Sequence, residues 1–490
     1  MEIIQQEITA EKSAWTELEA FVLARQEKWE RGVGKPEFAS YEEELHERLM
    51  ALERELIGAE LKKYDLSTKE IEVAGERYRA VMMSGKSYLS TAGEVRVERQ
   101  LYRRVGATQE ACICPLEWGA GIIGGYATPR AARQMNFAAA HLSPREAAGL
   151  FVEIGGMKPS HTTIDNQPKL IAEIWETNRE EWEEMLRQTE TVPPQATIVA
   201  ISLDGVMAPI RQKDGTKKTV TAAKQASGPL GYREIGCGTV TLYDQATQRL
   251  STVRYGRMPE YKKGTLRQQL TAECHHILPQ TASLTVVKLA DGAPDNWDYL
   301  SHLDLGLSAA ALLTIQQLEI VDFYHAAEHL KRGCDAIWPR HPDKSKTKFE
   351  TLRTTLKEVE GGVNTVIRSF RAYLGRLPEK NKPTLQSELT YFLNQQSRMD
   401  YFTYLRQGLP IASGIIEATC KTLVTQRLKC SGMRWSISGG QAILSLRSII
   451  QSNRWPQAWS LIQAQFCKPI SIITAQPSPL SRYHSLPLAA

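Results

Sequence analysis

The sequence lacks the features of a disulfide-rich, secreted or membrane-spanning protein. Its eight cysteines have no framework spacing, which excludes a disulfide scaffold. No stretch approaches the ~18 uninterrupted apolar residues that a membrane helix needs, so we expect no membrane partner. The first twelve residues are polar and acidic, unlike a secretory leader. A reducing cytoplasm is therefore the expected location.

Carboxylates are missing from the end of the chain. Glu417 is the last one, and the 73 residues after it contain eight Lys or Arg. This segment carries a charge of +8, whereas residues 1–417 carry −3. Positive charge without any negative charge favours a polyanionic partner such as nucleic acid. An ordinary solvated basic face is the alternative.

The length of 490 residues suggests about three domains. The apolar fraction of 42% and the charged fraction of 23% are typical of globular chains with sizeable cores. In chain order, we expect N-terminal helices (1–66), a β-hairpin region (67–125), a helical region (126–190), the first part of an α/β core (195–341), an α-helical insertion (342–410), the last part of that core with basic helices (411–467) and a disordered tail (468–490).

Two helical regions precede the core. Residues 1–66 hold 16 carboxylates against 9 Lys or Arg, with apolar residues at helical spacing, and are interpreted as a possible dimerisation element. In the second region, Thr128-Pro129, Ser143-Pro144 and Ser160 are start signals for three helices. A Gly155-Gly156 turn before the third resembles a helix-turn-helix, whose third helix would read a DNA groove. Compact three-helix packing without DNA is an equal alternative.

The core is predicted from its buried strands. Residues 197–206 (TIVAISLDGV) and 284–293 (LTVVKLADGA) are continuous apolar runs that end in Asp-Gly. Strands over 233–244 and 250–258 and a helix over about 264–278 lie between them, and a further strand at 318–326 enters a helix. Three strands, a helix, then alternating strand and helix is the order of an RNase H-like domain.

Asp204 and Asp291 would leave the sheet at its rim, and Glu417 opens a basic helix. Two Mg²⁺ (or Mn²⁺) ions need several carboxylate oxygens that converge within about 4 Å. Two strand-end aspartates and a glutamate from a helix across them can supply these oxygens. A single Asp-Gly more often marks only a turn, but two of them after buried strands favour a two-metal site for phosphodiester chemistry.

The ordered motifs SLDGV (202–206), REIGCGTVTLYD (233–244), LADGA (289–293), VDFYHAAEHL (321–330) and SGIIEATCK (413–421), with the ending at 426–455, resemble those of bacterial insertion-sequence DDE transposases. The nearest group is the Kra-type branch related to the Mutator-like superfamily. The resemblance implies that Asp204, Asp291 and Glu417 are the catalytic, metal-binding triad. It also matches Asp322 and His325 to the family's Asp-x-x-His signature and implies a helical insertion before the glutamate.

On this resemblance the expected activity is metal-dependent cleavage and strand transfer of DNA. The partners are terminal inverted repeats and target DNA, handled by a homodimer. His325 would be catalytic, either orienting a triad member or touching the scissile phosphate, with Asp322 behind it. The candidate DNA contacts are Lys421, Arg427, Lys429, Arg434, Trp435 and, in a basic loop at 211–224, Lys217 and Lys218.

Two alternatives remain. The chain could be an inactive or domesticated relative that only binds DNA, although the intact triad argues against this. The segment HAAEH (325–329) also matches the His-x-x-Glu-His pattern of a zinc metallopeptidase. No zinc is expected elsewhere, because Cys112 and Cys114 have no second cysteine pair with which to complete a tetrahedral site.

Overall fold

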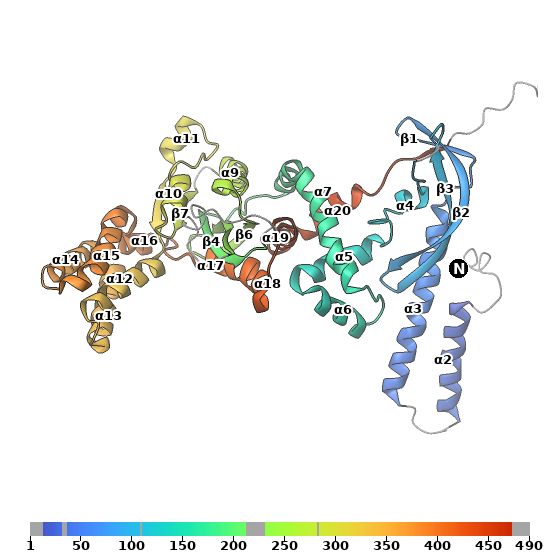
Figure 1. Ribbon diagram of the computed structural model, residues 1–490, viewed down its shortest axis with the longest axis horizontal. Coiled ribbons are helices and arrows are strands. Elements are labelled where there is room, and N and C mark those ends of the chain that lie inside the picture. Colours follow the sequence, from blue (N-terminus) through green and yellow to red (C-terminus); the bar gives the residue numbers. More distant parts are fainter. Residues whose placement is uncertain (1–12, 32–36, 108–109, 212–230, 282–283, 473–490) are drawn as a thin grey trace, which may run out of the picture. The chain divides into compact units, whose positions relative to one another are not determined.

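The structure is a computed structural model, shown in Figure 1. It describes residues 13–31, 37–107, 110–211, 231–281 and 284–472. The chain divides into two compact units, residues 1–170 with 459–490 and residues 171–458, hereafter unit 1 and unit 2. Within the described ranges, no helix is both long enough and apolar enough to cross a membrane.

Unit 2 is built on a five-stranded mixed sheet with the order β6-β5-β4-β7-β8. Strands β6, β5 and β4 are antiparallel, whereas β4, β7 and β8 are parallel. The five strands predicted from apolar runs are confirmed. Their bounds are β4 (Ile198–Pro209), β5 (Tyr232–Tyr243), β6 (Arg249–Arg257), β7 (Thr285–Ala290) and β8 (Gln317–Val321).

Helices cover both faces of this sheet. On one face, Gly236 and Gly238 of β5 leave room for leucines of α9 (Gly264–Ile277). On the other, Ile235 and Cys237 pack with residues of α17 (Gly414–Thr419) and α19 (Ile437–Gln451). Because neighbouring residues of a strand point to opposite faces, β5 serves two separate cores. Its continuous apolar run reflects this burial on both faces.

The remaining helices of unit 2 follow β7 and β8. Residues 342–410 contain helices and turns and no strand, as predicted for the insertion, and they join the main core through side chains such as Phe370 and Phe392. The bounds are α10 (Pro294–Ser301), α11 (Ala309–Thr314), α12 (Phe323–Ile337), α13 (Pro342–Glu358), α14 (Gly362–Leu374), α15 (Lys382–Gln395), α16 (Tyr401–Arg406) and α18 (Gln426–Leu428).

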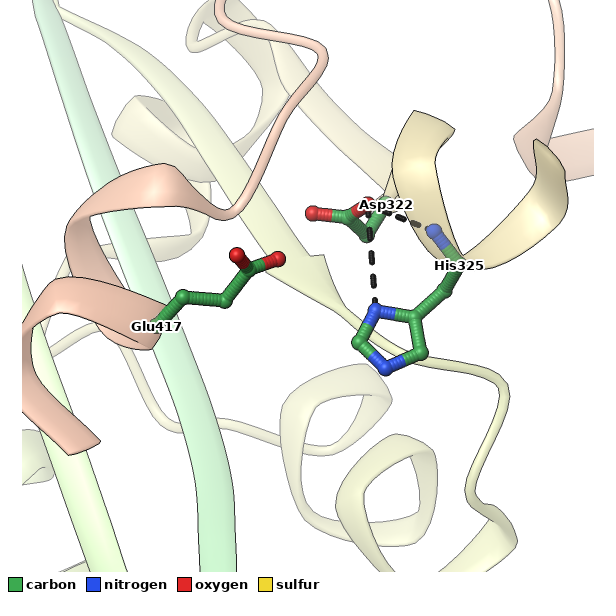
Figure 2. Close-up of side chains that lie close together, drawn as sticks. All are labelled: Asp322, His325 and Glu417. Carbon is green, nitrogen blue, oxygen red and sulfur yellow. Dashed lines mark hydrogen bonds and ion pairs between the residues drawn. The ribbon is translucent and has the colours of Figure 1, made fainter. Parts of the chain in front are cut away.

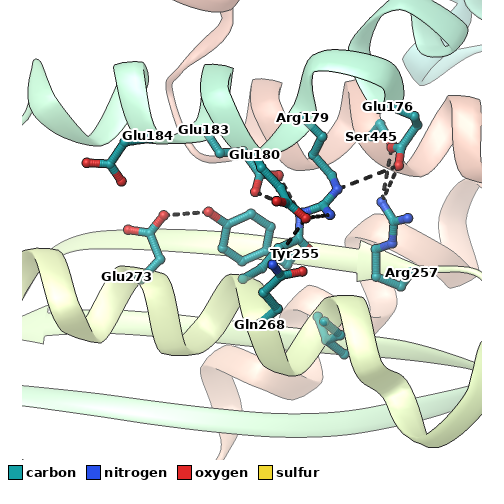
Figure 3. A network of polar contacts seen from close by, with 12 residues as sticks. Glu176, Arg179, Glu180, Glu183, Glu184, Tyr255, Arg257, Gln268, Glu273 and Ser445 are labelled. Atoms are coloured by element: carbon teal, nitrogen blue, oxygen red, sulfur yellow. Dashed lines mark hydrogen bonds and ion pairs between the residues drawn. The ribbon is translucent and has the colours of Figure 1, made fainter. Parts of the chain in front are cut away.

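A polar network attaches helix α7 (His161–Gln188) to the sheet of unit 2 (Figure 3). Glu176 accepts hydrogen bonds from Arg257 of β6 at 2.9 and 3.0 Å and from Ser445 of α19 at 2.7 Å. Nearby, Tyr255 of β6 donates to the buried carboxylate of Glu273 in α9. Charged contacts, and not apolar packing alone, therefore hold this helix in place.

Unit 1 contains a four-stranded antiparallel sheet with the order β3-β2-β1-β9. The three helices predicted from Thr128-Pro129, Ser143-Pro144 and Ser160 are present, and Ser143 forms a full capping box with Glu146 at the second. The bounds are α2 (Ala14–Glu30), α3 (Phe38–Lys63), β1 (Glu70–Val73), β2 (Glu76–Ser90), β3 (Gly93–Arg104), α4 (Pro115–Gly119), α5 (Pro129–His141), α6 (Pro144–Glu153) and β9 (Ser471–Ile472), with the first residues of α7. The last helix, α20 (Trp455–Ala464), runs from unit 2 into unit 1.

Ser84-Gly85 lies inside β2, where an added side chain on Gly85 would meet Glu98 and Arg96 of β3. One local prediction for unit 1 was wrong. The tail from 468 was expected to be disordered, but Ser471 and Ile472 form β9. This short strand pairs with β1, so it satisfies backbone groups of an otherwise open sheet edge. Residues 473–490 lie outside the described part.

Candidate active site

Asp291 directly follows β7, whereas Asp204 lies inside β4, which continues to Pro209 beside β5 and does not end at the aspartate as predicted. Ser202 of β4 pairs with Leu289 of β7, so continuing the register by two residues sets Asp204 opposite Asp291. Neighbouring strands lie about 4.8 Å apart. Tertiary structure thus brings together two aspartates that are 87 residues apart in the sequence.

Asp204 is held between its own strand and the helix that follows Glu417. One carboxylate oxygen accepts the Gly205 N–H at 2.6 Å, and the other lies 3.5 Å from Cys420 Sγ. Burial and the charge of Asp291 raise the pKa of Asp204, against the hydrogen bond from Gly205. Two carboxylates that repel each other in a partly buried place are suited to a cation.

Asn296 holds Asp291. Its amide donates to Asp291 Oδ1 at 3.1 Å and to the Leu203 carbonyl of β4 at 3.3 Å. The Ala293 N–H also donates to Asp291 Oδ1, at 3.1 Å. A buried amide on α10 therefore fixes the end of β7 against the middle of β4. Sequence reasoning missed Asn296, because an asparagine in the first turn of a helix has no pattern that marks it as a bridge.

Asp322 follows β8 and connects three segments. It is fully buried and caps α12 through a hydrogen bond of 2.9 Å from His325 N. Its second oxygen accepts the Ser413 N–H, and Ser413 Oγ donates to Glu417 Oε1 at 3.1 Å. Burial would raise the pKa of Asp322, but the hydrogen bonds from His325 and Ser413 lower it below the usual value.

Figure 2 shows Asp322, His325 and the carboxylate of Glu417 close to one another. His325 Nδ1 lies 3.8 Å from Asp322 Oδ1, which is an ion-pair distance rather than a hydrogen bond. Interaction with this carboxylate raises the pKa of His325 to about 9, although burial opposes the shift. The imidazole is therefore protonated at neutral pH.

Among the described residues, one group of three potential metal ligands has its ligand atoms within 4.8 Å of one another, namely Asp322, His325 and Glu417. Asp204 and Asp291 do not belong to this group. They lie near enough that Asp291 raises the pKa of His325 and His325 lowers that of Asp204. The described arrangement thus has an aspartate pair beside a carboxylate and imidazole group, and not one compact triad.

The glycines that follow the two aspartates leave room for side chains from other elements to pack closely against the backbone. An added side chain on Gly205 would collide with Glu234 of β5, and one on Gly292 would collide with Tyr391 of α15. Tyr391 also stacks on His329, with ring centroids 3.4 Å apart. Burial and the charges of Asp291 and Asp322 raise the pKa of Tyr391. The helical insertion therefore contributes to this site, which no sequence motif indicated.

The residues expected to contact DNA differ in exposure. Lys421 and Arg434 are exposed, and Lys429 is partly exposed. Arg427 is buried, with its guanidinium 5.1 Å from the centre of the Trp435 ring. The Trp435 indole donates to the Leu428 carbonyl at 2.9 Å, so this pair packs the helix end. Lys217 and Lys218 lie outside the described residues.

His329 gives no support to a zinc peptidase. Its Nδ1 lies 2.6 Å from Glu388 Oε2 of the insertion, and its ring is stacked on Tyr391. The potential ligand group contains His325 and lacks His329. The two histidines of the HAAEH segment therefore have different partners in the structure.

Comparisons with known proteins do not assign the chain to a family. No protein-family model matches the chain, and no curated protein matches it. Among solved structures, the Drosophila P element transposase strand transfer complex is similar over 72% of this chain and 84% of that chain, with 12% identity and a TM-score of 0.26. A TM-score this low carries no argument about fold or function.

Proposed function

We propose that this chain is a DNA transposase of the DDE type, with an RNase H-like core that cleaves and joins DNA strands. The observation that carries the proposal is the meeting of Glu417 with the ends of parallel strands that carry acidic residues. Glu417 lies beside Asp322 and His325, and the same helical segment reaches Asp204 through Cys420. These residues are up to 216 positions apart in the sequence.

The sheet supports the RNase H-like interpretation. Its order β6-β5-β4-β7-β8, with three antiparallel strands followed by two parallel ones, is the arrangement expected from the strand and helix order. The helical insertion between β8 and the segment that carries Glu417 agrees with the same resemblance. Within the DDE transposases, we assign the chain to the bacterial insertion-sequence group that its motifs resemble.

The donor set fits magnesium or manganese, because hard divalent cations favour carboxylate oxygens. Asp204, Asp291 and Glu417 would hold two such ions, and the raised pKa of Asp204 beside Asp291 supports a cation there. Bound divalent ions supply an activated water or 3′-hydroxyl and neutralise the leaving oxygen. Asp322 is available as an additional ligand, and the protonated His325 as a support.

The chain's own residues have distinct roles in this proposal. Protonated His325 offers a positive charge and an N–H donor to a phosphate oxygen. Asp322 keeps His325 charged and holds Ser413, which in turn orients Glu417. The exposed bases Lys421 and Arg434, with Lys429, would contact the DNA backbone. Two copies would bring the two element ends together.

The test is a nicking assay on labelled DNA that flanks the reading frame, with a gel shift on the same DNA. Glu417→Gln keeps the size of the side chain but removes the charge that holds a cation. We expect at least about a thousandfold loss of nicking, because several kcal/mol of barrier stabilisation are lost. Binding should persist. Glu350→Gln, at an exposed position of α13, is the matched control.

The other outcomes separate the alternatives. Tight DNA binding by the wild type with no Mg²⁺- or Mn²⁺-dependent nicking would favour the DNA-binding relative. One zinc per chain, with peptide hydrolysis that is lost in His329→Gln, would favour the peptidase. Normal nicking by Glu417→Gln would remove Glu417 from the site.

A further inference from the structure

Helices α2 and α3 form an antiparallel hairpin with a defined inner face (Figure 1). The Ala14 N–H donates to Glu55 at 2.6 Å, and Phe21 stacks on Tyr41 with ring centroids 5.4 Å apart. The Arg48 guanidinium lies 4.7 Å from the centre of the Phe21 ring. The inner residues of both helices recur with alternating steps of three and four, the spacing of two packed helices.

A row of large apolar side chains lies directly beside this inner face. Each member follows an inner position by one residue, a rotation of about 100°. Because the helices are antiparallel, the same rotation brings both sets to the same side of the hairpin. The members, hereafter the hairpin stripe, are Trp15 (57% exposed), Val22 (45%), Trp29 (59%), Leu49 (42%) and Leu56 (46%).

The described sheet of unit 1 packs mainly on the face of α3 that carries Arg54 and Gly58. Arg54 donates to the Ala92 carbonyl at 2.8 Å, and Gly58 is buried and faces Val95 of β3. Glu53, between Leu49 and Leu56 on the stripe side, accepts a hydrogen bond of 3.0 Å from Thr91, but Leu49 and Leu56 remain 42% and 46% exposed. The sheet therefore leaves the stripe exposed.

We propose that the hairpin stripe is a self-association surface that a second copy of this chain covers. Five half-exposed side chains, two of them tryptophan, present on the order of 500 Å² of apolar area, at the upper end of what monomers expose. With a polar rim, such a patch approaches the ~800 Å² per partner of a standard interface. Tryptophan at its ends is also the residue type that anchors interfaces.

Symmetry favours a second copy, and charge disfavours a polyanionic occupant. Trp15 and Trp29 are each seven residues from Val22, so a twofold axis at Val22 sets each tryptophan opposite the other in the partner. A twofold interface requires such self-complementarity. Residues 1–66 carry 16 carboxylates against 9 Lys or Arg, which disfavours nucleic acid and anionic lipid because like charges repel.

The test is light scattering of the full-length protein at several concentrations, without DNA or metal. We expect the wild type to approach twice its 55.0 kDa mass, and Val22→Glu and the double variant Trp15→Glu/Trp29→Glu to be monomers. Leu23→Glu, one position away on the same helix and 54% exposed, is the matched control and should remain dimeric. Circular dichroism melting verifies that the variants are folded.

Cross-linking gives a second measurement that does not depend on disrupting the surface. Val22→Cys should form cross-linked dimers with a short bis-maleimide well above the level of Leu23→Cys and of the wild type, whose exposed Cys430 and Cys467 set the background. A wild type that is monomeric at every concentration, or stripe variants that dimerise as the wild type does, would overturn the proposal. Neither measurement uses DNA cleavage, so its failure is separate from failure of the proposed transposase.

Discussion

Ser413 is the residue through which the buried Asp322 acts on the exposed Glu417. Its backbone N–H is held by Asp322, and its hydroxyl holds a Glu417 oxygen. Long surface carboxylates lose rotamer freedom when they are fixed, so a glutamate that must meet a metal ion benefits from such a donor. Asn296 performs the same task for Asp291.

For Ser413→Ala, we expect about tenfold slower nicking and a higher Mn²⁺ requirement, because one hydrogen bond of about 1.4 kcal/mol is lost. The free energy of unfolding should change by less than about 1 kcal/mol. Ser413→Thr retains the hydroxyl and should restore most of the activity. Equal loss in the alanine and threonine variants would contradict the positioning role.

His325 predicts a pH dependence of stability. Its pKa in the folded chain is about 9, above the usual 6.5, so its interaction with Asp322 stabilises the fold fully below about pH 6.5. This contribution is lost as the pH rises through 9. The difference in free energy of unfolding between wild type and His325→Gln should therefore shrink from pH 6 to pH 10, measured by urea unfolding in EDTA. A difference that stays constant across this range, or one that also appears for the exposed His341→Gln, would refute the assignment.

At the scale of elements, Arg454 joins three parts of unit 2. Its guanidinium lies 2.8 Å from Glu273 of α9, 3.0 Å from the Tyr255 hydroxyl of β6 and 2.6 Å from Glu190, just after α7. Burial would raise the pKa of Glu273, but Arg454 outweighs it and the pKa is lowered. The carboxylate thus stays charged inside the protein, which is tolerable only while it is paired.

Arg454→Met should lower the free energy of unfolding by about 3 kcal/mol, because the buried Glu273 loses its nearest ion pair and keeps only Arg187, at 3.5 Å. Adding Glu273→Gln should recover part of this loss, since the remaining group is neutral. Urea unfolding monitored by fluorescence measures both variants, with the exposed Arg371→Met as control. A double variant less stable than Arg454→Met would show that the charge is not the cause.

At the scale of the whole molecule, DNA binding depends on which basic side chains are exposed at the surface. The segment after Glu417 carries all of the chain's excess positive charge, but burial removes Arg427 and Arg454 from the surface. Lys421, Lys429 and Arg434 remain at least partly exposed. Contacts with phosphate must come from such accessible side chains, because counterion release requires a close approach to the DNA backbone.

Replacing Lys429 and Arg434 together with alanine should weaken DNA binding and flatten its salt dependence. Each lost phosphate contact lowers the slope of log K against log salt by roughly 0.9, so the pair should lower it by up to about 1.8. Fluorescence anisotropy at several salt concentrations measures this slope. Lys344→Ala/Lys346→Ala removes the same charge from exposed positions of α13 and should leave the slope unchanged.

Local pattern was enough to predict the elements. Continuous apolar runs identified β4 and β7, start signals at Thr128, Ser143 and Ser160 predicted three helices, and the alternation of strand and helix predicted a mixed sheet. These features are readable because they depend on neighbours within a few residues. The Asp-Gly ends of two runs predicted that both aspartates leave the sheet at one rim, which is right for Asp291 and wrong for Asp204, because β4 continues past it beside β5.

Tertiary structure alone decided which groups meet there. Ser413 and Tyr391 belong to segments far from the aspartates in sequence, and Asn296, close to Asp291 in the chain, also reaches Leu203 of β4. No spacing in the sequence indicates these contacts. Arg427 looks like any other basic residue in the sequence, and packing against side chains such as Trp435 and Met433 buries it. The sequence by itself determined the strands, caps and charge of this protein, because these are local properties. The tertiary contacts of each side chain depend instead on how distant segments pack.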